Sequence, residues 1–194
     1  MQSSGSASVR HAYDPAQRGF HWVTAIIIFA AIGLGIWARL LPPGGGVRPQ
    51  LLDLHKSLGM TVLFLVVFRL AWRAIRGEPV YRRPPDPLTR SAAQVAHWGL
   101  YALMIFMPVS GYVFSGAGGH SVPWFGLFSW PIVVSQDKQI ANFAQGLHYA
   151  GAWIIGGVLA LHVLAVVWHR WVKRDEVLSR MWPPLGGRDA SGAR

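Results

Sequence analysis

Four histidines lie in or at the ends of long apolar stretches, where ionisable side chains are costly and therefore mark functional sites. They are His21, His55, His148 and His162. A neutral imidazole is a common ligand of iron, copper and zinc. The sequence has no Cys, which excludes cysteine-ligated iron–sulfur clusters and the covalent attachment of c-type haem. A haem bound by these histidines is therefore b-type.

The spacing of the last two histidines predicts how the four are paired. His148 and His162 are fourteen residues apart, which in a helix separates them by about 21 Å and returns them to within about 40° of one face. His162 then lies at the depth of His21, and His148 at the depth of His55. The spacing predicts two axial pairs, each holding one haem iron: His21/His162 and His55/His148. Two axial imidazoles leave no open position on the iron, which favours electron transfer over oxygen chemistry.

The same histidines have other interpretations. They can bond across helices, relay protons, or line the path of a transported ion or metal, and a transporter of that kind predicts no haem absorption. The remaining histidines fall outside the matched pairs, and we expect interfacial or solvated positions for them: His11, His97, His120 and His169. Among these, His97 has a position at the edge of an apolar stretch that suits contact with a quinone headgroup.

The elements that position these residues are four apolar stretches near the length of about 20 residues that crosses hydrocarbon. They cover about residues 20–38, 51–72, 96–114 and 143–168. The chain is 52% hydrophobic and only 13% charged, as expected for a protein solvated by lipid. Four spans in one chain satisfy their backbone in lipid as helices. The sequence therefore predicts an all-α fold, an integral membrane four-helix bundle that binds two b haems.

Basic residues indicate the orientation of the bundle. One side of the spans carries many more Lys and Arg than the other, which carries Arg39, Arg48, Lys56 and Lys138. The positive-inside rule then places both termini in the cytoplasm. The net charge of +10 matches anionic lipid, and we expect no nucleic-acid partner. We expect one domain at residues 18–183 between mobile cytoplasmic tails at residues 1–17 and 184–194.

Two cations and one aromatic loop lie close to the histidines in the sequence. Lys56 and Arg69 are candidates to pair with haem propionates or to attract an anion, and both side chains also suit snorkelling or solvation. Glycines on the same helices leave room for a flat macrocycle or for close helix packing. The aromatic loop at residues 124–130 is a candidate interfacial layer and a candidate cover for a quinone or the outer haem.

Several stretches resemble the prokaryotic cytochrome b561 family of small four-helix di-haem proteins. They are RGFHW at 18–22, LHKSLGMTVLFLVVFRLAWR at 54–73, AHWGLYALMIFMPVSGY at 96–112, LHYAGAWIIGGVLALH at 147–162, and RMWP at 180–183. The resemblance implies that the four haem ligands of the family fall on His21, His55, His148 and His162. It also implies a multi-pass protein of the bacterial inner membrane.

The activity that the resemblance implies is quinone-linked electron transfer. One activity of the group is oxidation of superoxide at the outer face with reduction of ubiquinone, which makes this chain a candidate superoxide:ubiquinone oxidoreductase. Basic residues near the outer haem would then raise the encounter rate of the anion. Related cytochrome b subunits instead pass electrons between a hydrogenase or dehydrogenase and the quinone pool, and this chain would then need a redox partner protein.

Overall fold

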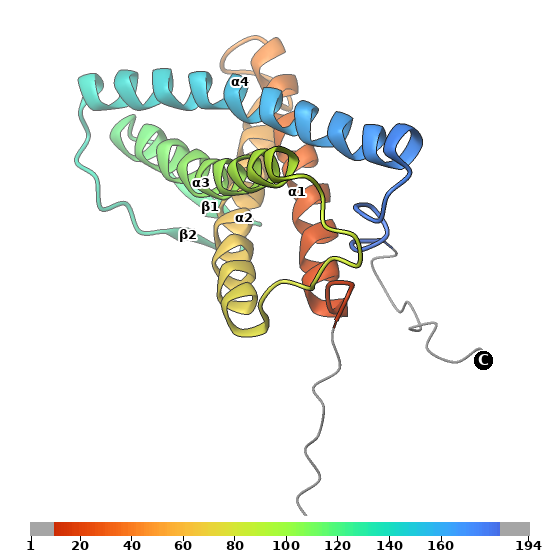
Figure 1. The fold of residues 1–194 in the computed structure, drawn as a ribbon. Helices are drawn as coiled ribbons and strands as arrows, with labels where there is room; N and C mark the ends of the chain where they lie inside the picture. Colours follow the sequence, from red (N-terminus) through yellow and green to blue (C-terminus); the bar gives the residue numbers. More distant parts are fainter. Residues whose placement is uncertain (1–9, 183–194) are drawn as a thin grey trace, which may run out of the picture.

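The protein is described by a computed structural model over residues 10–182, within which it forms four long helices and a small β-hairpin (Figure 1). The elements are α1 Pro15–Leu40, α2 Arg48–Arg76, α3 Pro87–Ala117, β1 Val122–Trp124, β2 Phe128–Trp130 and α4 Lys138–Trp168. A π-helical turn, His169–Lys173, continues α4. All four helices are long and apolar enough to cross a membrane. The predicted all-α membrane fold is confirmed.

Helices α1, α3 and α4 begin before their apolar stretches, where aspartates cap them in the polar flanks. Asp14 precedes α1 and its side chain accepts a hydrogen bond from the backbone N of Gln17 at 3.0 Å, while the backbone N of Asp14 donates to Gln17 Oε1. Asp86 and Asp137 cap α3 and α4 in the same way. Such caps satisfy N–H groups that a helix start leaves free. Apolar run length alone therefore underestimates each of these helices.

The N-terminal boundary of the folded unit also differs from the expected one. Residues 1–9 and 183–194 lie outside the described residues, and they include most of both tails that the sequence assigned as mobile. The described residues before α1 are instead held by backbone hydrogen bonds: Tyr13 N donates to Arg180 O, and Val80 N donates to Arg10 O. The folded unit thus includes residues 10–17, which the sequence placed in the tail.

The helices form two antiparallel pairs. α1 packs along α2 and α3 along α4, while α2 and α3 join the pairs; Figure 1 shows the second pair crossing the first. The apolar core lies at this junction and contains Ile28, Val62, Val66, Tyr101 and Met104. Leu159 of α4 packs against this core, and Ile155 is buried, but most of the large apolar side chains of α4 are exposed.

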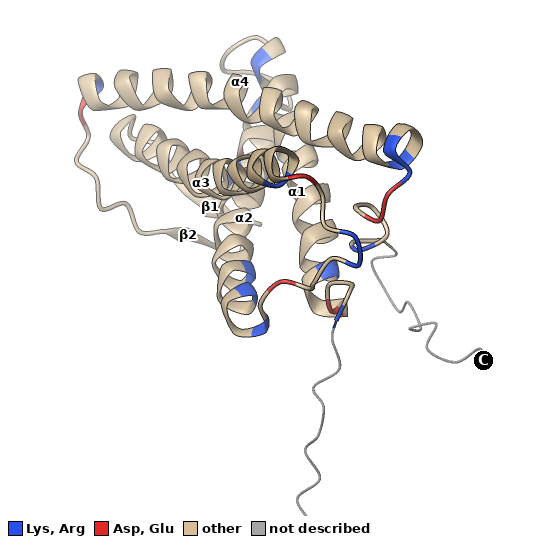
Figure 2. Cartoon of the chain, viewed as in Figure 1, with Lys and Arg blue, Asp and Glu red and all other residues tan. Residues whose placement is uncertain are grey.

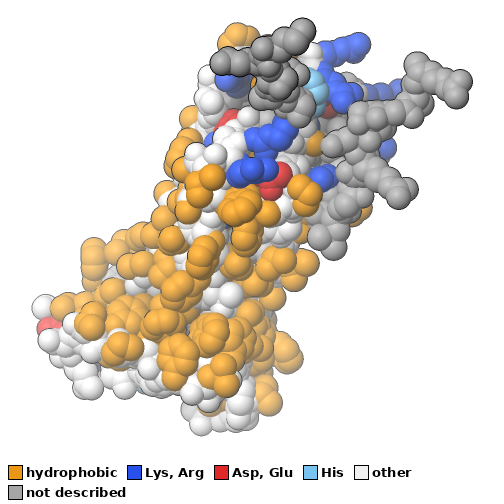
Figure 3. Space-filling view, turned by 90° about the horizontal axis from the view of Figure 1, so that it is seen from below, with side chains coloured by type: hydrophobic (Ala, Val, Ile, Leu, Met, Phe, Trp, Pro, Cys, Tyr) orange, Lys and Arg blue, Asp and Glu red, His pale blue; other side chains and the backbone are white. Residues whose placement is uncertain are grey.

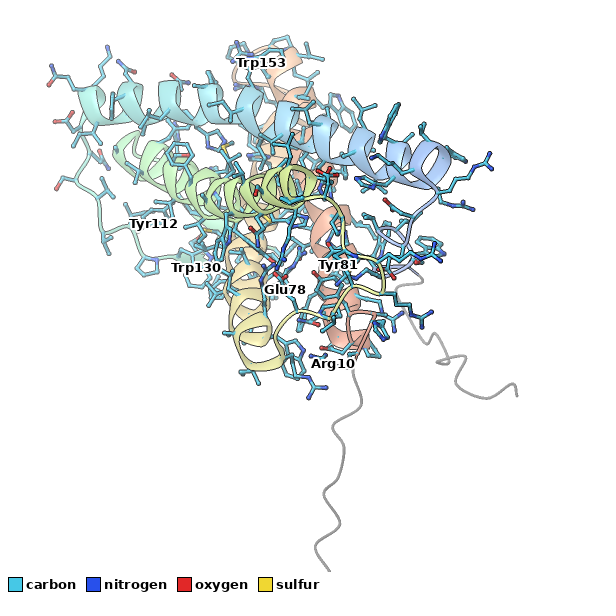
Figure 4. All side chains as sticks on the ribbon, viewed as in Figure 1. Arg10, Glu78, Tyr81, Tyr112, Trp130 and Trp153 are labelled. Carbon is cyan, nitrogen blue, oxygen red and sulfur yellow. The ribbon has the colours of Figure 1, made fainter. Side chains whose placement is uncertain are left out.

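The charged and apolar surfaces divide as a membrane protein requires. Lys and Arg gather where α1 begins, α2 ends, α3 begins and α4 ends, and we call this the basic end (Figure 2). The opposite end, which carries the β-hairpin, is called the hairpin end. Between them lies a broad apolar surface (Figure 3). Trp153, for example, is 85% exposed and points away from α4 (Figure 4), which is stable only against lipid.

The β-hairpin was not predicted from the sequence. β1 and β2 are antiparallel, with Val122 opposite Trp130, and Leu127 N donates to Trp124 O across the turn. Phe125 and Gly126 both have positive φ, of 51° and 73°, as in the turns that match the twist of a hairpin. Ser57 of α2 anchors it by accepting from Phe125 N at 2.9 Å. The aromatic loop therefore packs on α2 as a folded unit.

Candidate functional site

The structure brings His55 and His148 together near the hairpin end. His55 lies on α2 and His148 on α4, and their ring centroids are 6.0 Å apart with the ring planes at 87°. His55 Nδ1 lies 2.8 Å from Ala31 O, and His148 Nδ1 lies 3.1 Å from Met107 O. Because a carbonyl only accepts, each Nδ1 carries the proton and each Nε2 is left with its lone pair. Both rings are thus oriented to bind a metal through Nε2.

Two glycines leave room for these rings. A Cβ added at Gly35 of α1 would lie 3.0 Å from His55 Cε1, and one at Gly111 of α3 would lie 3.0 Å from His148 Cε1. Any side chain larger than hydrogen at these positions would press on the imidazole. The sequence indicated only the glycines on the ligand-bearing helices, so Gly111 on α3 was missed. The signal for Gly111 is its fourteen-residue spacing from His97, which places both on one face of α3.

His21 of α1 and His162 of α4 form the second pair, toward the basic end. Their ring centroids are 6.4 Å apart with the planes at 59°. Arg69 of α2 donates from Nη2 to His21 Nδ1 at 3.0 Å. His162 and His148 lie on one uninterrupted helix, so the two pairs are separated by about 21 Å along its axis.

A third histidine joins the second pair. The ring of His97 on α3 lies 5.6 Å from that of His162, so it faces the site and is not a peripheral residue. The sequence placed it at the edge of a span, outside the matched pairs. Helical spacing could have identified it. Tyr101 and Met104 follow His97 at i+4 and i+7, so the three residues share one face of α3, and both Tyr101 and Met104 are buried.

The ring distances allow a test of whether these residues fit a haem. An imidazole nitrogen binds a transition metal at about 2.0 Å, and the ring centroid lies about 1.1 Å farther away, so two opposed imidazoles on one metal have centroids about 6.2 Å apart. The observed distances of 6.0 Å and 6.4 Å both match this value. The His97–His162 distance of 5.6 Å is farther from this value than either of the other two. The two pairs predicted from the sequence therefore have the spacing that axial ligands need.

Three cations that the sequence placed near the outer pair contact groups other than its histidines. Lys56 Nζ donates to Ser121 O at 2.9 Å and lies 3.7 Å from Asp53 Oδ1, which ties it to the loop before the hairpin. Arg39 lies over the Tyr149 ring at 4.5 Å, and Arg48 Nε donates to Ala38 O. Arg69 is different, because it contacts a histidine of the second pair directly.

The C-terminal segment covers the second pair at the basic end. Arg180 is only 5% exposed, stacks on Tyr81 at 3.5 Å and donates from Nε to His11 O. Trp22, beside His21, donates to Met181 O at 3.1 Å. Figure 4 shows Tyr81 where the α2–α3 loop meets this segment. The C-terminal segment therefore packs on Trp22, whose ring lies against His21.

Two titratable groups outside the spans are perturbed at this end. Burial raises the pKa of Tyr13, and the negative charge of Glu78 raises it further. Burial also opposes ionisation of Asp14, but hydrogen bonds from Gln17 N and Trp72 Nε1, with the charge of Arg76, outweigh it and lower the pKa of Asp14. The Asp14 carboxylate therefore stabilises the start of α1 as an anion.

Comparison with known proteins gives consistent matches over nearly the whole chain. A family model described as prokaryotic cytochrome b561 matches residues 12–184. "Cytochrome b561 homolog 2" of Escherichia coli K12 is 32% identical over 169 residues, which cover 87% of this chain and 90% of that protein. "Probable superoxide oxidase CybB" of Yersinia pestis is 28% identical, over 90% of this chain and 98% of that protein. "Cytochrome b561 homolog 1" of E. coli K12 is 25% identical over 174 residues, which cover 88% of this chain and 97% of that protein.

Proposed function

The chain belongs to the prokaryotic cytochrome b561 family, and from this premise we propose that it is a di-haem cytochrome b that carries electrons across the bacterial inner membrane. Membership implies a b-type haem cofactor and a multi-pass membrane protein. The observation that carries the proposal is the pair of ring distances, 6.0 Å and 6.4 Å, at two depths of one bundle.

The proposed ligands are His55 and His148 for one haem, and His21 and His162 for the other. A bound b haem supplies a reversible one-electron centre at each site. The protein holds the rings through carbonyl contacts at Ala31 and Met107. Its apolar helices exclude water, and each site is filled by two imidazoles, so electron transfer is the chemistry that this arrangement supports.

The proposed orientation places the basic end in the cytoplasm and the hairpin end outside. This follows from the positive-inside rule applied to the helix ends of the structure (Figure 2). The His55/His148 site is then the outer site and the His21/His162 site the inner site. Electrons from an outer donor reach the outer site first and leave toward a membrane quinone.

The proposed donor and acceptor are superoxide and ubiquinone. A relative that covers 90% of this chain is named a probable superoxide oxidase. In the balanced reaction two superoxide anions lose one electron each to give two O2, and ubiquinone takes up the two electrons with two protons to give ubiquinol. The proposal needs no protein nucleophile and no side chain that bonds to substrate.

Stopped-flow mixing tests this proposal. The oxidised, purified protein is mixed with superoxide, and the α-band of reduced b haem is followed with and without ubiquinone. We expect the band to rise rapidly and to decay when ubiquinone is present. A haem spectrum that stays oxidised would reject superoxide as donor and favour a subunit that receives electrons from a dehydrogenase or hydrogenase. A protein without a Soret band would reject the haem assignment and favour a histidine-lined transporter.

A further inference from the structure

Arg69 is a cation at membrane depth that contacts the inner histidine pair. It lies seven residues before the end of α2 at Arg76, about 10 Å along the helix axis. Its Nη2 donates to His21 Nδ1 at 3.0 Å, and its guanidinium lies 5.4 Å from the Tyr101 ring centroid. A guanidinium stays protonated in proteins, so this site carries a full positive charge.

The carboxylate that would balance this charge does not come from the described part of the chain. Among residues 10–182 no Asp or Glu forms an ion pair with Arg69, whereas its neighbour Arg73 pairs with Glu78. Tyr101 offers a cation–π contact and a side-chain hydrogen bond, but it is a neutral partner and does not balance the charge. A partly buried cation in a membrane helix is costly without an anion.

The hydrogen bond to His21 is incompatible with metal binding through Nε2. A neutral imidazole that binds a metal through Nε2 carries its proton on Nδ1, and a protonated Nδ1 cannot accept from a guanidinium. Arg69 must then turn to another acceptor. A haem at this site brings carboxylates of its own, since its two propionates are anionic.

We propose, on the basis of the di-haem function above, that Arg69 binds a propionate of the inner haem and thereby sets the inner site at a higher reduction potential than the outer site. Arginine suits this role because its fork pairs with both oxygens of a carboxylate. The cation favours the form of the site that holds the extra electron. Arg69 is thus a positioning residue that directs electrons inward.

Among the described residues, no cation donates to a histidine of the outer site as Arg69 does to His21. Both Nδ1 atoms of the outer site donate to backbone carbonyls, and Lys56 is bonded to Ser121 O and close to Asp53. Arg39 lies over Tyr149. Under the proposal, a cation in direct contact with the inner site alone gives the electron path its direction.

The test uses the full chain in a His148→Ala background, in which the inner haem alone remains. Potentiometric titration of the α-band compares this variant with the same chain carrying Arg69→Gln. We expect the equilibrium constant for reduction to fall about tenfold or more, where tenfold is about 59 mV for one electron. An unchanged potential would overturn the proposal. Lys56→Gln is the matched control, and a fall of the same size there would also overturn it.

A second variant decides the matter if Arg69→Gln does not retain haem. Arg69→Lys keeps the charge, so we expect the haem to be retained. The equilibrium constant for its reduction should stay within about threefold of the value in the His148→Ala chain. A tenfold fall in Arg69→Lys would reject charge as the cause. Failure of the proposed di-haem function would be distinguishable from failure of the Arg69 proposal. In that case His148→Ala would retain as much haem as the unaltered chain, or the unaltered chain would bind no haem.

Discussion

The rings of His55 and His148 face each other at 6.0 Å, nearly perpendicular, from helices that belong to different helix pairs. Each ring is oriented by a carbonyl on a further helix, Ala31 on α1 and Met107 on α3. The geometry of the outer site therefore depends on how all four helices are placed relative to one another. Substitutions at its ligands and at the residues that support them give separable outcomes.

Replacement of His148 by Ala is expected to remove one haem per chain and leave the other, because the two sites lie about 21 Å apart. Haem content and the α-band of the purified protein measure this. His120→Ala is the control, since His120 is exposed and forms no ring pair with another histidine among the described residues. Retention of both haems in His148→Ala would contradict the ligand assignment.

Gly111→Ala is expected to disturb the same site without removing a ligand. Its Cβ would lie 3.0 Å from His148 Cε1, so the ring must move, at a cost of about 1–3 kcal/mol. We expect lower occupancy or a shifted spectrum of the outer haem. Gly33→Ala on α1 meets nothing within 4 Å and should leave the spectrum unchanged. Equal effects of the two substitutions would rule out the steric explanation.

Ser57→Ala is expected to loosen the β-hairpin. Ser57 is 1% exposed and accepts from Phe125 N at 2.9 Å, and an unpaired buried N–H costs about 1–3 kcal/mol. Hydrogen exchange at residues 122–130 should become faster, while exchange in α3 stays the same. Ser121→Ala, at an exposed position of the preceding loop, is the control. Unchanged exchange in Ser57→Ala would show that aromatic packing alone holds the hairpin.

Acid is expected to weaken the start of α1 through Asp14. Its pKa is lowered in the folded protein, so the carboxylate stabilises the fold above the unfolded pKa of about 3.9, and this contribution is lost as pH falls through the lower folded pKa. Thermal unfolding of the protein and of Asp14→Asn, compared between neutral pH and about pH 3, measures the effect. Asn retains a helix cap without the charge. The variant should therefore lose less stability in acid, and an equal loss would argue against Asp14.

The sequence was sufficient for the features that follow from helix regularity. The histidine pairing rested on the fourteen residues between His148 and His162, and α4 is continuous between them, so the two rings do lie at separate depths. The hairpin was not accessible in this way, because each strand has three residues, β1 contains Pro123, and Phe125 adopts a positive φ that is uncommon outside glycine. Its anchor at Ser57 comes from a distant helix. His97 was missed because apolar run length marks where a span begins but not which face of the helix is buried.

Under the proposed ligand assignment, α4 contributes one ligand to each haem, and α4 is the last of the helices to be synthesised. Neither iron can then be bound on both sides until α4 has been synthesised. A chain truncated before residue 148 would insert its first three helices and capture no haem in either site. Cofactor loading would thus act as a checkpoint of completed synthesis, and the haem-free fragments would be left for membrane proteases to remove.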